Sequence, residues 1–495
     1  MSRKWQTVFA IVVVFSTLLA GCGAPAAPVA PTAAPPAAVP ADWAKQPMKA
    51  TTTVVLSVES GAQEKTLASY AAQIKKELNI DLKVVAHPFS EQYEIQYLDL
   101  SSGTGQYDVL SHWPLYNADF APFLEPLGNI RPGGQDAVWK DLFLDDTFPA
   151  YKSNQIYKGK VYGITYDGDV KLLHYRHDLA TDPKEREGFK AKYGYDLNVD
   201  DMTWEQFLDV ARWFQRPDKD FYGDAEIAGF LAGWFFRDRY MGMGGHYFDY
   251  DTMKAFPKPE ICIKAAQHVL DTVATASPPE AKSYEFEDAR NQIIVNNRVM
   301  FVAQWPDVWK WANDAKLSKA VGKVWVAEMP GFLKDGKVVH RPELNGGRIL
   351  TVNKASKAKE AAYKVLVFFG NPDITKQLVY NNDTWLDPWR LSHGDISLLK
   401  HLGSDDAGRQ NYLDVLKKST QDAYPYLQIP GVGKYYEVQE RWAKKLFAAQ
   451  VTPADACSNM AKEFDAITDQ IGRDKQIKEY KDYVDSVLKP LKLYP

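Results

Sequence analysis

The sequence predicts an α/β protein of more than one domain, with domains that interleave along the chain. A length of 495 residues indicates two or three domains. Between residues 51 and 110 the pattern alternates strand and helix, the rhythm of an α/β domain with a parallel sheet. No stretch after Trp43 has the composition of a flexible linker, so we expect the domains to exchange segments.

The elements of this first part follow from the spacing of apolar residues. Residues 51–58 are β-branched and apolar and predict a strand, and residues 81–86 and 107–110 predict two more. Residues 63–78 place apolar side chains at helical spacing, and a further helix is expected around 92–100.

The middle of the chain mixes extended passages with helices. Residues 159–175 predict a long extended passage broken at Gly168. Thr203 has the character of an N-cap with Gln206 as its capping-box partner, which predicts a helix running to Trp213. The other expected elements are helices over 260–275 and 357–370 (the second ended by a C-cap glycine), strands over 299–303, 324–327 and 348–352, and a mostly helical tail after 372.

Composition excludes two classes of protein. The chain is 45% hydrophobic and 25% charged, which is too apolar for a mainly disordered protein. Lys and Arg number 59 against 63 Asp and Glu, so the basic excess that nucleic-acid binding requires is absent from the sequence.

The N-terminus has the pattern of a signal peptide over residues 1–21. Arg3 and Lys4 are basic, and residues 8–20 are apolar apart from one serine and one threonine. This run is too short to span a bilayer, which takes about 20 apolar residues, but it suits the apolar region of a secretory signal.

Leu-Ala-Gly-Cys at 19–22 resembles a bacterial lipobox, in which Cys22 receives a lipid; the alternative is a plain signal with a coincidental cysteine. Residues 23–40 hold six prolines and eight alanines without a charge, so we expect an extended spacer over 22–49. The expected location is extracytoplasmic, in the periplasm or at the outer face of the cytoplasmic membrane, with membrane contact through the lipid on Cys22.

The other two cysteines, Cys262 and Cys457, leave two alternatives open. They could pair in an oxidising compartment, or remain two buried thiols that act as small apolar side chains.

Several short motifs occur in a fixed order: GQYDV (105–109), LEPL (124–127), YKGKVYGI (157–164), YRHDL (175–179), TWEQF (203–207), GGRI (346–349), KEAA (359–362) and PWR (388–390). Together with the lipobox and spacer, this set resembles the solute-binding proteins of bacterial ABC importers, in the large extracellular family that takes up sugars. One departure is Asn-Arg-Val-Met at 297–300, where the family often has Gly-Lys-Ala-Met.

The resemblance implies a two-lobed, periplasmic-binding-protein-like fold of type II. Lobe one would comprise 50–165 plus 346–386, and lobe two 166–345 plus 387–495, joined by crossing segments and closing by a hinge. It further implies a monomeric, non-enzymatic receptor without cofactor or nucleic acid. Such a receptor captures a carbohydrate, either a saccharide or a polyol, between the lobes and hands it to membrane permease subunits.

A sugar requires carboxylates, amides or arginine beside exposed aromatic rings. Asp167 and Asp169 flank Gly168, and in an extended passage both carboxylates would face one cleft, although a solvated turn is the alternative. Because loops at the carboxyl ends of strands supply ligand contacts, further candidates follow two expected strands. These candidates are His112 and Trp113 after the strand at 107–110, and Trp305 and Asp307 after the strand at 299–303.

The remaining candidates are polar groups or aromatic rings at expected junctions: Glu59, Trp234, Gly347, Arg348 and Trp385. Any of these tryptophans could instead belong to a core. A metal site at His174 and His177 is disfavoured, because in an extended passage their spacing puts them on opposite faces. Two other classes of function stay open, a lipid-anchored glycoside hydrolase and the same fold binding a peptide or polyamine.

Overall fold

The computed structural model describes residues 40, 42–229, 231–344 and 346–494. The expected signal peptide at 1–21, the lipidated Cys22 and most of the spacer lie outside the described residues. The fold described below is that of the unit formed by residues 41–495.

A first sheet has the strand order β2-β1-β3-β13-β6. Its strands are β1 (Thr52–Glu59), β2 (Ile80–His87), β3 (Val109–His112), β6 (Gly163–Asp167) and β13 (Arg348–Val352). The expected parallel sheet is correct for β1, β2 and β3, but β13 joins from far along the chain and runs antiparallel to both β3 and β6. The third strand begins two residues later than expected.

Helices and two short strands pack around this sheet: α1 (Ala62–Ser69), α2 (Ala71–Leu78), α3 (Gln92–Ser102), α4 (Asn117–Phe120), α5 (Leu127–Ile130), α6 (Gly134–Asp141), α7 (Pro149–Gln155), β4 (Ile156–Tyr157), β5 (Lys160–Val161), α15 (Lys359–Phe369) and α16 (Pro372–Val379). The single helix expected at 63–78 is two helices separated at Tyr70, whose ring packs edge-on against Phe368 and Phe369. Gly370 does end α15, but with right-handed backbone (φ −84°) instead of the usual left-handed cap.

A second sheet has the order β10-β7-β9-β8. Its strands are β7 (Leu172–Arg176), β8 (Tyr222–Asp224), β9 (Val299–Gln304) and β10 (Val324–Glu328), and a separate hairpin joins β11 (Phe332–Lys334) to β12 (Lys337–Val339). The helices around it are α8 (His177–Ala180), α9 (Pro183–Tyr193), α10 (Trp204–Trp213), α11 (Ala232–Gly242), α12 (Pro259–Thr275), α13 (Phe286–Ile294), α14 (Asp307–Ala312) and α17 (Asp406–Gln421). The capping box predicted before α10 is present, since Thr203 and Gln206 exchange hydrogen bonds.

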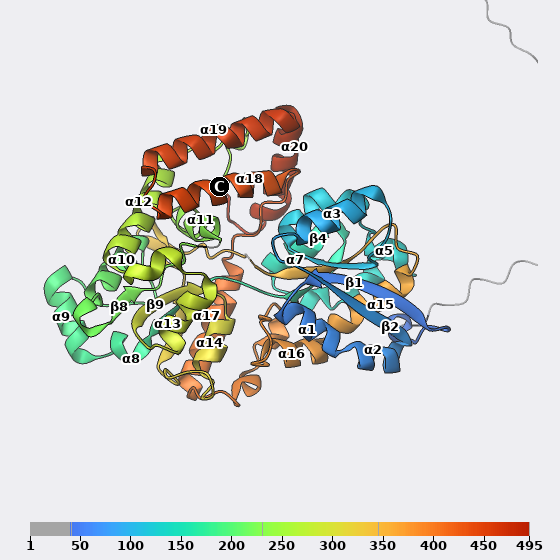
Figure 1. Cartoon of the computed structure of the whole chain (residues 1–495), viewed down its shortest axis with the longest axis horizontal. Helices are drawn as coiled ribbons and strands as arrows, with labels where there is room; N and C mark the ends of the chain where they lie inside the picture. Colours follow the sequence, from blue (N-terminus) through green and yellow to red (C-terminus); the bar gives the residue numbers. More distant parts are fainter. Residues whose placement is uncertain (1–39, 41, 230, 345, 495) are drawn as a thin grey trace, which may run out of the picture. The chain divides into compact units, whose positions relative to one another are not determined.

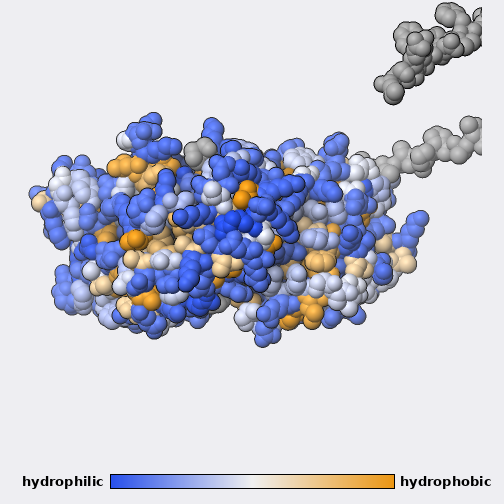
Figure 2. All heavy atoms as spheres, turned by 90° about the horizontal axis from the view of Figure 1, so that it is seen from above, coloured by the Kyte–Doolittle hydropathy of each residue, from blue (hydrophilic) through white to orange (hydrophobic). Residues whose placement is uncertain are grey.

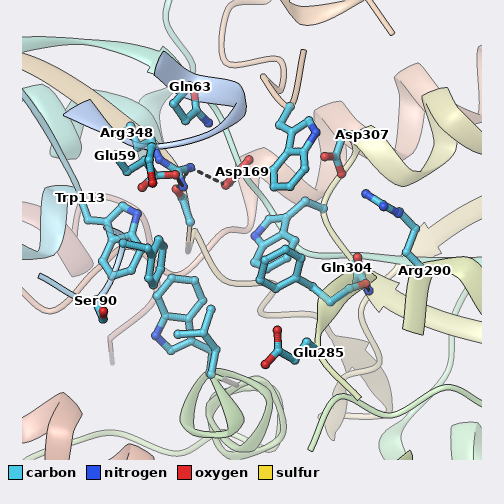
Figure 3. Close-up of a pocket in the computed structure, with 18 of the residues that line it drawn as sticks. Glu59, Gln63, Ser90, Trp113, Asp169, Glu285, Arg290, Gln304, Asp307 and Arg348 are labelled. Atoms are coloured by element: carbon cyan, nitrogen blue, oxygen red, sulfur yellow. Dashed lines mark hydrogen bonds and ion pairs between the residues drawn. The ribbon is translucent and has the colours of Figure 1, made fainter. Parts of the chain in front are cut away.

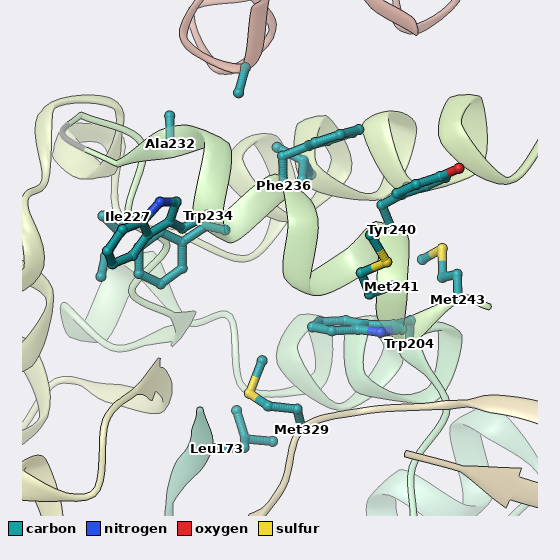
Figure 4. Packing of buried hydrophobic residues seen from close by; sticks show 14 of the residues in the cluster. Leu173, Trp204, Ile227, Ala232, Trp234, Phe236, Tyr240, Met241, Met243 and Met329 are labelled. Atoms are coloured by element: carbon teal, nitrogen blue, oxygen red, sulfur yellow. The ribbon is translucent and has the colours of Figure 1, made fainter. Parts of the chain in front are cut away.

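The C-terminal helices complete this half of the unit. They are α18 (Val432–Phe447), α19 (Pro453–Ile471) and α20 (Arg473–Tyr483). The first two pack beside α11 and α12, and α20 contacts α19 (Figure 1). Every residue of α11 is buried, and around it Trp204, Phe236, Tyr240 and Met241 form the centre of a large aromatic and methionine-rich core (Figure 4).

Three segments run between the sheets and contact one another. The passage from β6 to β7 breaks at Gly168, as predicted, because a side chain there would collide with the carbonyl of Pro388 in a second segment. Gly168 also donates its backbone N–H to the carbonyl of Asp387 at 3.0 Å. In the third segment, the carbonyl of Glu343 accepts the Lys171 N–H at 3.0 Å.

The departure noted at 297–300 has a local explanation. Asn297 has left-handed backbone (φ 55°) in the turn between α13 and β9. Asparagine tolerates this conformation better than most residues other than glycine, so the turn is kept without a glycine.

Polar residues predominate on the face shown in Figure 2, where apolar ones lie in small, separate patches. Within the described ranges, no helix is both long enough and apolar enough for a membrane crossing.

Cys262 and Cys457 form a disulfide between α12 and α19, which decides between the two alternatives. Their Cα atoms lie 6.0 Å apart, although 195 residues separate them in sequence. Sequence spacing carried no information about this proximity.

We expect replacement of both cysteines by serine to lower the free energy of unfolding by about 2–5 kcal/mol, because the unfolded chain loses a long-range cross-link. Denaturant unfolding of the double variant and of the native protein, each with and without reductant, measures the difference. Equal stability of the oxidised native protein and the variant contradicts a structural role for the disulfide.

Candidate ligand-binding site

A cavity of about 410 Å³ is lined by side chains from loops and helices that adjoin the two sheets (Figure 3). Eight predicted site residues line it: Glu59, Trp113, Asp169, Trp234, Trp305, Asp307, Arg348 and Trp385. Three predicted residues are not among its lining: His112, Asp167 and Gly347.

One side of the cavity is organised by the guanidinium of Arg348. It donates to Glu59 at 2.5 Å, to Asp167 at 2.9 Å and to the carbonyl of Gly346 at 2.6 Å. Asp169 lies 3.7 Å from the same guanidinium, and Figure 3 shows this ion pair at the cavity. Burial alone would lower the pKa of Arg348, but Glu59 and Asp167 raise it well above its usual value, so the group stays charged.

The expectation that Asp167 and Asp169 face one cleft together is wrong. Asp167 ends β6 and is fully buried, where it accepts hydrogen bonds from Gln63 Nε2 and from the backbone N–H of Asp387, both at 3.0 Å. Asp169 has left-handed backbone (φ 35°), so the passage is not extended there and only this second carboxylate lines the cavity. Strained backbone of this kind at a non-glycine residue is typical of functional sites.

Asp307 lies across the cavity from Arg348, at the first turn of α14 (Figure 3). It is 7% exposed, and its Oδ1 is buried without a hydrogen-bond partner among the described residues. Burial raises the pKa of Asp307 to about 6, although Lys310 and Arg290 oppose this rise. Lys310 itself donates to three backbone carbonyls, and no described residue forms a direct ion pair with the Asp307 carboxylate.

Seven aromatic rings border the cavity in an unbroken series. Neighbouring rings stand 4.6–6.4 Å apart between centroids and are steeply inclined, at 64° to 83° between planes. In order along the series they are Phe89, Trp113, Trp234, Trp305, Phe286, Trp385 and Trp311.

The predicted residues outside the lining have structural contacts. His112 is buried, and its ring bonds to Thr351 Oγ1 at 3.1 Å and to the Trp113 carbonyl at 2.9 Å. Burial lowers its pKa to about 4, so it is neutral at physiological pH. The glycine that borders the cavity is Gly346 (φ 102°), and Gly347 does not line it. Position 346 requires glycine, because a side chain at this position would collide with the Asp169 carboxylate.

Sequence reasoning missed eleven lining residues: Ser60, Gln63, Phe89, Ser90, Leu231, Glu285, Phe286, Arg290, Gln304, Trp311 and Gly346. Ser60, Phe89 and Gln304 follow or end strands, so the rule that located Trp113 could have found them. Phe286, Arg290 and Trp311 lie on α13 and α14 and reach the cavity only through the packing of those helices. Among the described residues, no group of three or more His, Cys, Asp or Glu is placed to hold a metal ion.

Known proteins resemble this chain in sequence and in structure. A probable amino-acid ABC transporter periplasmic-binding protein of Sinorhizobium fredii is 26% identical over 326 residues, which cover 64% of this chain and 69% of that protein. A solute-binding protein from Agrobacterium radiobacter K84, solved with ribitol, has a TM-score of 0.70 at 20% identity and covers 85% of this chain and 100% of its own. The maltose-bound MalE3 of T. maritima has a TM-score of 0.67 at 23% identity, covering 84% of this chain and 100% of its own.

The two structural neighbours establish the fold, which is the predicted two-lobed α/β fold of solute-binding proteins. Residues 59–376 match the sequence model of the bacterial extracellular solute-binding proteins. The chain belongs to this family.

Proposed function

We propose that this protein is the substrate-binding component of an ABC importer that captures a carbohydrate and delivers it to permease subunits in the membrane. The observation that carries the proposal is the cavity itself, where an arginine–carboxylate cluster faces a series of aromatic rings. The hydroxyl groups of a sugar can hydrogen-bond to the arginine–carboxylate cluster, and its C–H faces can pack against the aromatic rings. The ribitol and maltose bound by the two structural neighbours support the same class of ligand.

The proposed division of the chain is 50–165 plus 346–386 for one lobe and 166–345 plus 387–495 for the other. The first sheet contains β13, which supports the assignment of the segment around 348–352 to lobe one. Trp389 and Tyr412 belong to a core cluster that joins residues of both sheets, such as Leu350 of β13 and Val326 of β10, so we place the closest interleaving of the lobes just after residue 386. A ligand that contacts both lobes would favour the closed arrangement.

Binding without catalysis is the expected behaviour. A carbohydrate at one hundred times its dissociation constant should stabilise the folded protein by about 2.7 kcal/mol, seen as a higher melting temperature, while the sugar is recovered unchanged. Chromatography of oligosaccharides after incubation is the direct check. Turnover into shorter products would instead identify a glycoside hydrolase, and stabilisation only by peptides or polyamines would identify another polar solute as the ligand.

Two substitutions test the site. Asp169→Ala removes the cavity-facing carboxylate and Trp305→Ala a central ring, and each should weaken carbohydrate binding at least about tenfold, or about 1.4 kcal/mol. Trp139→Ala is a control for ring removal, because Trp139 lies outside the cavity lining. Calorimetric titration measures the affinities, and the assignment fails if both site variants bind like the native protein while their unfolding curves match it.

We further propose that Cys22 carries a lipid that holds the protein at the membrane surface. Lipid chains anchor by apolar burial, about 0.8 kcal/mol for each buried CH₂ group. Expression of the full chain with Cys22→Ser should therefore move the protein from the membrane fraction to the extracytoplasmic fluid without changing ligand affinity. Fractionation and the intact mass of the mature protein check this, and a native chain that lacks the acyl mass contradicts the anchor.

A further inference from the structure

The cavity holds more acidic than basic groups. Four carboxylates line it, from Glu59, Asp169, Glu285 and Asp307, against the two guanidinium groups of Arg290 and Arg348. Both guanidinium groups already have partners within the protein.

Arg348 is neutralised by Glu59 and by Asp167 behind the cavity wall. Arg290 stacks on Trp311, with its guanidinium carbon 4.4 Å from the ring centroid, and lies 3.9 Å from Glu287. Arg290 and Lys310 act on Asp307 only through space, since no described residue forms an ion pair with this carboxylate.

Asp307 provides the second, independent observation. Its side chain lines the cavity (Figure 3), and its Oδ1 is buried and accepts no hydrogen bond from the described residues. The Oε1 atom of Gln63, also in the lining, is another buried acceptor without a partner. A buried acceptor that is left unpaired is costly, so both atoms indicate a donor that arrives with the ligand.

The aromatic rings have the geometry of a cage instead of a flat platform. Trp113 and Trp234 meet at 65° with centroids 5.1 Å apart, and Phe286 and Trp385 meet at 83° with centroids 6.2 Å apart. A sugar ring lies flat on one aromatic face, whereas a compact cation is held best where several faces surround it. No described Lys or Arg side chain stacks on Trp113, Trp234 or Trp385.

We propose that the ligand carries a protonated amine, and that the cavity binds an amino sugar more tightly than the corresponding N-acetylated sugar, whose nitrogen is uncharged. This inference rests on the proposed function and specifies the substrate class. The ammonium group donates to Asp307 and lies against the aromatic rings. The hydroxyl groups of the same molecule use the polar atoms that remain, including the Nε–H of Arg290, which has no hydrogen-bond partner among the described residues.

Matched sugars provide the first test. Glucosamine and its short β-linked oligomers are titrated into the protein beside their N-acetylated counterparts, which keep the hydroxyl groups and lose the charge. At least one amino sugar should bind tenfold or more tightly than its acetylated partner. Equal or tighter binding of the acetylated series overturns the amine inference and leaves carbohydrate capture standing. Binding of none of these sugars also overturns the amine inference. The proposed function is contradicted as well only if spermidine binds while no carbohydrate, charged or neutral, stabilises the protein.

The second test removes the charge with little change of shape. Asp307→Asn should reduce the preference for the amine over its acetylated partner at least tenfold, with the acetylated sugar affected less than the amine. Asp196→Asn is the matched control, since that side chain is 71% exposed and lies outside the cavity lining.

Because Asp307 is buried and has no ion-pair partner in the described part of the chain, its asparagine variant should melt at or above the native temperature. A normal melting curve together with an unchanged preference for the amine refutes the role of Asp307. If that variant is unstable, the titration of the matched sugars into the native protein still decides the amine inference.

Discussion

Arg348 begins β13, the strand that enters the first sheet from far along the chain, and its guanidinium meets the carboxylates at the ends of β1 and β6. The pairing of β13 with β6 shifts register between Arg348 and Ile349. Such an irregularity re-aims a side chain, here along the sheet edge toward Glu59 and Asp167. A buried guanidinium that lacked these partners would lose its hydration without gaining any interaction in return. The strand order, which brings Arg348 to Glu59 and Asp167, and the cavity wall that they form therefore depend on each other.

The segments between the sheets transmit this arrangement to the aromatic side of the cavity. Lys171 follows Asp169 in the first crossing segment and is fully buried, with its Nζ 4.3 Å from the ring centroid of Trp305 and 3.7 Å from Asp238 of α11. Burial lowers its pKa to about 8, while Asp238 opposes that change. The crossing segment therefore holds Asp169 in one wall of the cavity and, two residues later, Lys171, which contacts the Trp305 ring of the other wall. A ligand that contacts either wall acts on the same few residues.

Local sequence patterns predict much of this architecture. Short apolar and β-branched runs predicted β1, β9 and β13, and the Thr203 capping box predicted the start of α10, because these signals arise within one element. The rule that ligand contacts follow strands placed Trp113, Trp305 and Asp307 at the cavity.

Other features depend on contacts between distant segments. The different environments of Asp167 and Asp169 result from the left-handed backbone at Asp169, which fits against Gly346 of another segment. The helix α13 was not predicted, and which of its residues meet the cavity depends on how it packs against β9 and α14. The disulfide was undecided for the same reason, because hydrophobic spacing says nothing about contacts between helices far apart in sequence.

The buried acids of the site oppose folding at neutral pH. Burial raises the pKa of Asp307 from 3.8 to about 6, and raises that of Asp169 as well. A carboxyl that binds its proton more tightly in the folded state lowers stability as pH rises through the interval between its unfolded and folded pKa values, and the loss persists at higher pH. Uncharged residues of similar size would avoid this loss, so folding alone does not account for the acids. A ligand that donates hydrogen bonds to them recovers part of the lost free energy on binding, which makes a destabilised empty cavity compatible with tight capture.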